Sequence, residues 1–167
     1  NEEVDVLYVD DLPSDVQVKT FVLLGAVPHK WDLTEAIARV KSGTIDAQEN
    51  PFANTVTYGV HKFHKFHTVT NHFYLSRPIF LHRNSFDAWP KDLQEAMRAA
   101  VKDAVVLQRE LAVAEEEEAK RAILAEGCEI IEITPAEHER FAAAVEPVLA
   151  GFRRTYGEEI FAMVPKA

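Results

Sequence analysis

The sequence lacks features that several classes of protein require. Its single cysteine, Cys128, excludes an intrachain disulfide framework and a zinc site built from cysteines. No apolar run approaches the roughly 18 residues needed to cross a bilayer. Positive charge is also short, with 18 lysine and arginine residues against 27 aspartate and glutamate residues and a net charge of −9. This balance argues against nucleic acid as the main partner, because phosphate binding requires a basic surface.

The motifs of common enzyme classes are missing as well. The sequence has no glycine-rich phosphate loop, no serine in a Gly-x-Ser-x-Gly setting and no pair of histidines next to a glutamate on a helix. Cys128 stands beside the acidic Glu129, an unfavourable neighbour for a thiolate nucleophile. We therefore predict neither an enzyme nor a cofactor.

Length and composition fit one α/β domain or a piece of a two-domain chain. The 167 residues are 47% hydrophobic and 27% charged, which is typical of a folded protein. Strand-like and helix-like segments alternate, and this favours an α/β layered fold. Strands are expected over 4–9, 27–31, 44–47, 63–70, 73–82 and 128–133, and helices over 16–24, 33–42, 53–58, 90–126 and 135–156.

The helix ends carry clear local signals. Asp32 with Glu35 three residues later predicts a helix start, and Gly43 predicts its end. The helix over 90–126 would be about 55 Å long, so it must bend or bridge two bodies. We expect it to pack through one apolar face, formed by Leu93, Met97, Ala100, Ala104 and Leu107.

Four histidines are candidate metal ligands, namely His61, His64, His67 and His72. The first three recur at steps of three, which would place them on one face of a helix but on alternating faces of a strand. Their neighbours are typical of a strand or turn, and no carboxylate has a ligand-like spacing. We therefore interpret the stretch as a polar connection and predict no metal site.

The stretch 43–51 gives the strongest indication of a binding site. A short strand there would deliver Gln48, Glu49 and Asn50 to its carboxyl end, where α/β proteins commonly bind ligands. The amide of Asn50 can donate and accept hydrogen bonds at once, which suits a small polar solute. A turn in which Asn50-Pro51 only starts the next helix explains the local pattern equally well.

In its wider context this stretch resembles the periplasmic solute receptors of TRAP transporters, the DctP-type family of extracellular solute-binding proteins. The resemblance covers roughly residues 13–164 and is carried by Asp46-Ala47-Gln48-Glu49-Asn50-Pro51, Glu35 and the segments 24–28, 65–72 and 89–94. It implies a periplasmic α/β receptor of two lobes, with one long helix that spans both. Such a receptor closes on a small organic solute, usually a carboxylate, and passes it to TRAP membrane permease subunits.

The resemblance also implies roles for individual residues. Asn50 matches an asparagine that faces the ligand, Leu33 falls where an aromatic commonly lines the cleft, and Arg77 takes another cleft-facing position. Gln48, Trp31 and Asn71 complete the predicted ligand-binding set.

Two departures from the family pattern affect the prediction. Family members are roughly twice as long, so residues 1–167 correspond to the C-terminal portion of a receptor, and any leader is expected to be removed or to lie outside this sequence. Asp10 and Asp11 stand where the family has its carboxylate-binding arginine, and they would repel a carboxylate. We therefore predict that Arg77 supplies the cation, although an ordinary exposed arginine fits the pattern equally well. An alternative function is a truncated relative without solute binding that self-assembles, or binds a partner, through the face left by the missing lobe.

Overall fold

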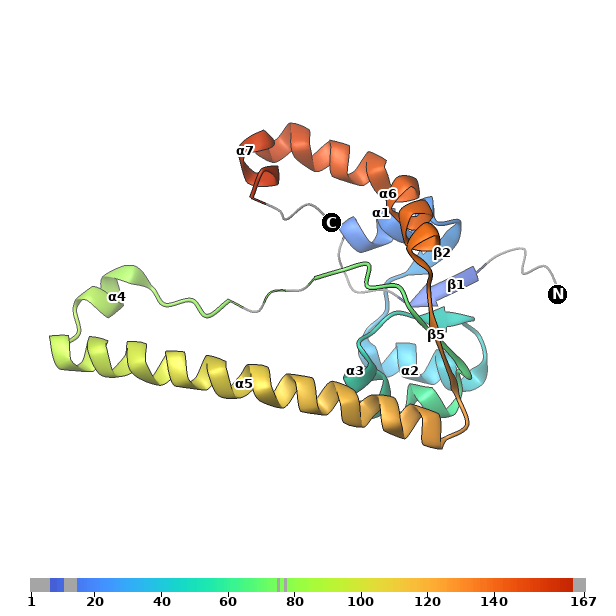
Figure 1. Ribbon diagram of the computed structural model, residues 1–167, viewed down its shortest axis with the longest axis horizontal. Coiled ribbons are helices and arrows are strands. Elements are labelled where there is room, and N and C mark those ends of the chain that lie inside the picture. The colour runs from blue at the N-terminus through green and yellow to red at the C-terminus, as the bar shows by residue number, and fades with distance from the viewer. Residues whose placement is uncertain (1–6, 11–14, 75, 77, 164–167) are drawn as a thin grey trace.

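The computed structural model describes residues 7–10, 15–74, 76 and 78–163. Asp11, Arg77 and the first residues of the strand expected over 4–9 lie outside the described residues. In chain order the elements are β1 (Leu7–Asp10), α1 (Asp15–Leu23), β2 (Ala26–His29), α2 (Leu33–Ser42), β3 (Ala47–Gln48), α3 (Phe52–Thr57), the 3-10 helix η1 (Val60–Lys62), β4 (Phe66–Val69), α4 (Arg83–Asp87), α5 (Lys91–Ala125), β5 (Glu129–Glu132), α6 (Pro135–Tyr156) and α7 (Glu158–Phe161) (Figure 1).

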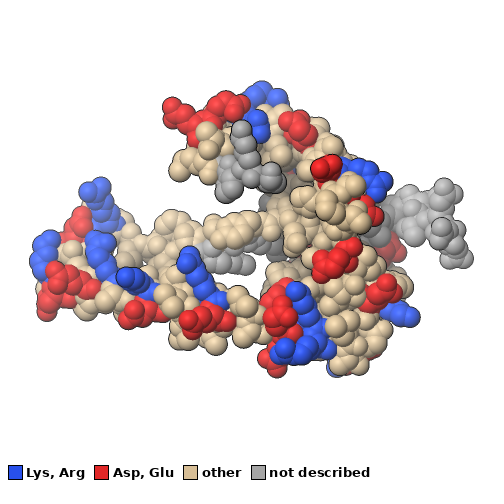
Figure 2. Space-filling model, viewed as in Figure 1, with Lys and Arg blue, Asp and Glu red and all other residues tan. Residues whose placement is uncertain are grey.

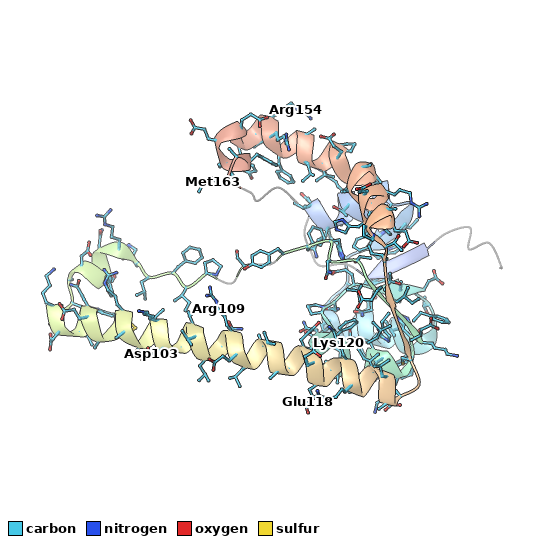
Figure 3. All side chains as sticks on the ribbon, in the orientation of Figure 1. Asp103, Arg109, Glu118, Lys120, Arg154 and Met163 are labelled. Atoms are coloured by element: carbon cyan, nitrogen blue, oxygen red, sulfur yellow. The ribbon has the colours of Figure 1, made fainter. Side chains whose placement is uncertain are left out.

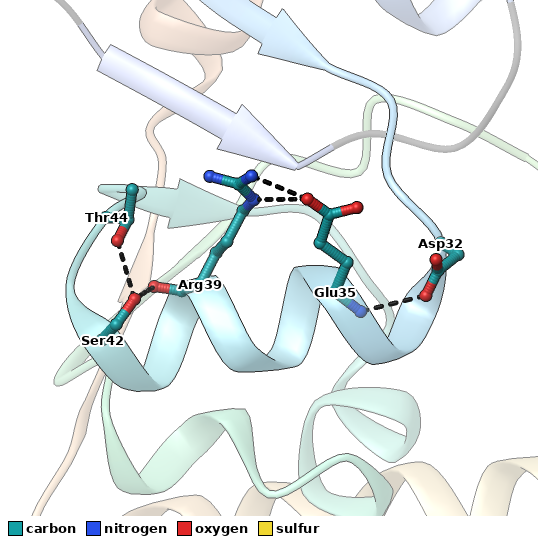
Figure 4. A network of polar contacts seen from close by, with 5 residues as sticks. All are labelled: Asp32, Glu35, Arg39, Ser42 and Thr44. Carbon is teal, nitrogen blue, oxygen red and sulfur yellow. Dashed lines mark hydrogen bonds and ion pairs between the residues drawn. The ribbon is translucent and has the colours of Figure 1, made fainter.

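Helix α2 has the predicted boundaries. The Asp32 carboxylate accepts a hydrogen bond from the Glu35 backbone N–H at 3.0 Å, and Gly43 ends the helix in the left-handed conformation at φ 67°. The Glu35 carboxylate in turn accepts bonds from Nε and Nη2 of Arg39 at 3.0 and 2.7 Å (Figure 4). Local sequence signals therefore suffice to place this helix.

Three parallel strands form the sheet that carries the candidate site, in the order β2-β1-β3. The register places Asp10, His29 and Gln48 at one level across the carboxyl edge. Because β2 and β3 lie on opposite sides of β1, the two crossover helices cover opposite faces, with α1 above and α2 below the sheet in Figure 1. The carboxyl edge between β1 and β3 is thus a topological switch point, where open α/β sheets bind ligands.

A second, two-stranded parallel sheet joins β4 to β5. Next to it the C-terminal part of α5 packs against α3, and there Ala119 and Ile123 are buried. A small core of Val40, Ile45 and Val60 lies near α2 and η1. No helix in the described ranges is both long enough and apolar enough to cross a membrane.

The final strand and helix were also predicted correctly. Thr134 and Glu137 form a reciprocal capping box, in which each side chain accepts a hydrogen bond from the backbone N–H of the other. The helix that follows, α6, begins at Pro135 and ends at Tyr156 as expected.

Three predictions differ from the structure. The strand expected over 73–82 is absent from the described residues, which form an irregular connection into the unexpected short helix α4. The long helix exists, but most of its predicted packing positions are exposed, namely Leu93, Ala100, Ala104 and Leu107. Figure 1 shows α5 as one continuous helix that meets the body of the protein near its C-terminal end. The third strand is also shifted, to Ala47–Gln48.

Candidate functional site

The site lies at the carboxyl edge of β3, where the side chains of two predicted residues, Gln48 and Asn50, form a hydrogen bond. Nδ2 of Asn50 donates a hydrogen bond to Oε1 of Gln48 at 2.5 Å, and Nε2 of Gln48 donates to Oγ1 of Thr55 at 3.3 Å. Thr55 belongs to α3 and is only 1% exposed. The buried hydroxyl therefore positions Gln48, and Gln48 positions Asn50.

Asn50 retains hydrogen-bonding capacity in this arrangement. Its amide has two N–H donors and a carbonyl acceptor, and the bond to Gln48 uses one donor. Its side chain makes no other hydrogen bond to the part of the chain that the structure describes. A partly buried amide with a free donor and a free acceptor can bind a hydroxyl or carboxylate of a small solute.

The carboxylate of Glu49 joins three segments around the site. Oε1 accepts a hydrogen bond from Nε2 of Gln17 in α1 at 2.9 Å. Oε2 lies 3.6 Å from Nε2 of His72, an ion pair when the imidazole is protonated. Oγ1 of Thr70 fixes the His72 ring through Nδ1 at 2.6 Å. Glu49 thus fixes the end of β3 relative to α1 and the 70–72 turn.

Gln17 and His72 were not predicted as parts of the site. Gln17 is only 4% exposed, but a glutamine within a helical pattern gives no sign of a partner 32 residues away. His72 was considered only as a metal ligand. His72 could have been predicted as part of the site, because it stands next to Asn71 in a segment that carries the family resemblance.

Trp31 and Leu33 follow the carboxyl end of β2 and differ in their contacts. The Trp31 ring stacks on His29 with ring centroids 4.6 Å apart, and the Arg39 guanidinium lies 4.4 Å from its centroid. Trp31 also packs against the small core near α2. Leu33, the first residue of α2, is 49% exposed. Leu33 is therefore the more accessible of the two for a ligand.

The remaining predicted residues are Asn71 and Arg77. Asn71 is exposed and adopts a positive φ of 45°, a conformation that asparagine tolerates better than most residues. No hydrogen bond within the described ranges connects Asn71 to Gln48 or Asn50. Arg77 lies outside these ranges, so its predicted role stays a prediction.

The three remaining candidate metal ligands, His61, His64 and His67, are buried or partly buried. No three His, Cys, Asp or Glu side chains among the residues described are placed to bind a metal ion. His61 and His67 are buried, and the His67 ring meets the Phe52 ring edge-on at 6.4 Å. Burial lowers the pKa of both His64 and His67, because it disfavours the charged imidazole. The fold therefore favours the neutral form of the His64 and His67 rings.

Comparison with known proteins identifies relatives along most of the chain. The model of the bacterial extracellular solute-binding protein family 7, DctP, matches residues 12–155. The C4-dicarboxylate-binding periplasmic protein DctP of Rhodobacter capsulatus is 28% identical over 145 residues, which are 86% of this chain and 44% of the relative. The chain thus spans about half the length of the curated relatives it matches.

Solved structures show the same fold and the same difference in length. A TRAP periplasmic solute-binding protein from Ochrobactrum anthropi is 27% identical with a TM-score of 0.79, over 95% of this chain and 50% of that one. Another, from Xanthobacter autotrophicus with bound β-D-galacturonate, is 26% identical with a TM-score of 0.75, over 90% of this chain and 50% of that one. The α/β architecture predicted from the sequence is therefore confirmed.

Proposed function

Because the chain belongs to bacterial extracellular solute-binding protein family 7, we propose that it is the solute-binding component of a TRAP-type secondary transporter. In this proposal it captures a small organic acid in the periplasm and delivers it to membrane permease subunits, without chemistry. The relatives support the ligand class, since one is a C4-dicarboxylate-binding protein and another holds galacturonate. Residues 1–167 would correspond to the C-terminal portion of such a receptor.

The observation that carries the proposal is the Asn50–Gln48 hydrogen bond at the switch point between β1 and β3. It orients a partly buried amide at the sheet edge where ligands bind in this class of fold. Burial of Thr55 and the bonds to Glu49 hold this edge in place. A preformed amide lowers the entropy cost of binding a solute.

An anionic solute also needs a nearby cation, because the chain has a net charge of −9 and Asp10 ends β1 at the same edge. Arg39 is paired with Glu35, and Lys30 is paired with Asp15 at 3.0 Å. Arg77 takes a cleft-facing position by the family resemblance, so we propose that it supplies the cation of the site. Arg77→Gln should weaken binding of an acid by roughly ten- to hundredfold, the cost of a lost charge-assisted hydrogen bond.

A thermal-shift assay with succinate, galacturonate and other small acids tests the proposal. A ligand at about 100 times its dissociation constant should stabilise the protein by about 2.7 kcal/mol. Asn50→Ala should weaken binding by about tenfold or more, because the solute loses a hydrogen bond. The matched control is Gln108→Ala, an exposed amide on α5 far from the sheet edge. The proposal is wrong if no acid stabilises the protein, or if both variants bind equally well.

The alternative, a self-assembling relative without solute binding, has one observation in its favour. Leu93, Leu107 and Leu111 on α5 are 46%, 56% and 59% exposed, an apolar surface of the kind that partners cover. Light scattering after size-exclusion chromatography separates the two functions. An oligomer that no acid stabilises supports the alternative, whereas a monomer that an acid stabilises supports the receptor.

A further inference from the structure

Helix α3, which orients the site through Thr55, is held at its start by a glutamate of α5. Pro51 stands at the N-cap position of α3, and a proline side chain has no hydrogen-bond acceptor. The backbone N–H of Ala53 instead donates a hydrogen bond to Oε2 of Glu116 at 3.4 Å, across 63 residues of the chain. A carboxylate from α5 therefore satisfies one of the backbone donors in the first turn of α3.

Glu116 belongs to a run of four glutamates at 115–118 but differs from the other three. It is half-buried, whereas its three neighbours in the run are exposed. Ala119 and Ile123 follow it by three and seven residues, which places all three side chains on one face of α5. Ala119 and Ile123 are buried, and this part of α5 packs against α3. Figure 2 shows acidic and basic side chains close together where α5 meets the body of the protein.

Lys120, one turn after Glu116, contacts the residue before Ala53. Its Nζ lies 5.9 Å from the ring centroid of Phe52, the first residue of α3, and 3.4 Å from Oε1 of Glu117. Figure 3 shows Lys120 on the side of α5 that faces the body of the protein, and Glu118 on the side that points away from it. Side chains of α5 thus contact the first two residues of α3.

The position of α3 sets the geometry of the two site amides. Thr55 of α3 accepts the hydrogen bond from Gln48, and Gln48 accepts the hydrogen bond from Asn50. We propose that Glu116 is a positioning residue of the solute site: it caps α3 from α5 and so holds the Gln48–Asn50 pair in the geometry that binds a solute. The inference concerns how the amides are held, and only its consequence for affinity rests on the function proposed above.

NMR spectra of the protein without solute test the geometry directly. The side-chain amide signals of Asn50 are identified as those that Asn50→Ala removes. Glu116→Ala should shift these signals and speed hydrogen exchange of the Ala53 backbone N–H about three- to tenfold, because that donor loses its acceptor.

Two conservative variants separate the hydrogen bond from the charge of the carboxylate. Glu116→Gln keeps an oxygen acceptor at the same reach and should leave the Asn50 signals and the Ala53 exchange close to those of the unaltered chain. Glu116→Asp keeps the charge but shortens the side chain, so it should behave as Glu116→Ala does. Glu118→Ala is the matched control, since it removes an exposed carboxylate of the same run and should change neither quantity.

Titration with succinate and with galacturonate tests the consequence for affinity. Glu116→Ala should weaken binding about three- to tenfold. In the Asn50→Ala background the same substitution should change the affinity less than about twofold, because both act through one amide. If neither acid binds the unaltered chain, the proposed function fails, and the Asn50 signals alone decide whether Glu116 positions the amide. Unchanged Asn50 signals in Glu116→Ala, equal shifts in Glu118→Ala, or an equal loss of affinity in both backgrounds would overturn the inference.

Discussion

The Glu49 carboxylate offers a direct test of how the site is held together. Glu49→Ala removes the acceptor of the 2.9 Å bond from Gln17, whose side chain is only 4% exposed. A buried amide donor left without a partner costs about 1–3 kcal/mol. The loss of the contact with His72 adds to this cost. We therefore expect the free energy of unfolding to fall by about 2–3 kcal/mol, which is about 1 M in the urea midpoint.

A double-mutant cycle separates this cause from a general weakening of the turn. Gln17→Met keeps the length of the side chain but removes the donor, so no amide is left unpaired when Glu49→Ala is added. The second substitution should then cost about 1–2 kcal/mol less than it does alone. Circular dichroism during urea unfolding measures all four proteins. Equal costs in both backgrounds would refute the reasoning, because the bond from Gln17 would then contribute nothing.

Three further predictions concern stability. The pKa values of His64 and His67 are lowered in the folded protein, so these histidines bind protons more readily in the unfolded chain. The urea midpoint should therefore be highest above pH 6.5, and it should fall as the pH falls towards the folded-state pKa values. His67→Gln should flatten this dependence, and an unchanged profile would contradict the assignment. Asp32→Ala should cost about 0.5–2 kcal/mol in urea unfolding through the lost cap of α2, and a cost no larger than that of Thr34→Ala would count against it. Ile123→Ala should cost about 2–5 kcal/mol, because the side chain is fully buried; the same substitution at exposed Leu124 is its control.

The parts of the fold that the sequence predicted are those with local causes. Helix α2 has its cap and its terminal glycine within the helix ends, so both boundaries could be placed from Asp32 and Gly43. The stretch 73–82 has an equally clear apolar pattern, yet its described residues contain no strand. A strand exists only through a neighbour that pairs with it, and the sequence of one segment cannot supply that neighbour.

For the long helix and the site too, the sequence predicted the features with local causes and missed those that depend on distant parts of the chain. Periodicity located the apolar face of α5, but not whether anything covers it, and the fully buried position proved to be Ile123 near the far end. At the site, Gln48 and Asn50 were predicted together because they are neighbours in the chain. The bond from Gln17 to Glu49 crosses 32 residues and depends on how α1 packs on the sheet. Long-range polar pairs of this kind leave no signature in one sequence.

The attachment of α5 has a mechanical consequence. The helix is held at its C-terminal end, around Ala119 and Ile123, and its other end at Lys91 carries α4 (Figure 1). At 1.5 Å per residue, about 42 Å separate Ala119 from Lys91. A tilt of about 5° at the attachment would displace the tip by about 4 Å. A small tilt of α5 relative to α3 therefore becomes a large displacement near Lys91. A spectroscopic probe near Lys91 would detect tilts that produce shifts too small to measure where α5 packs on α3.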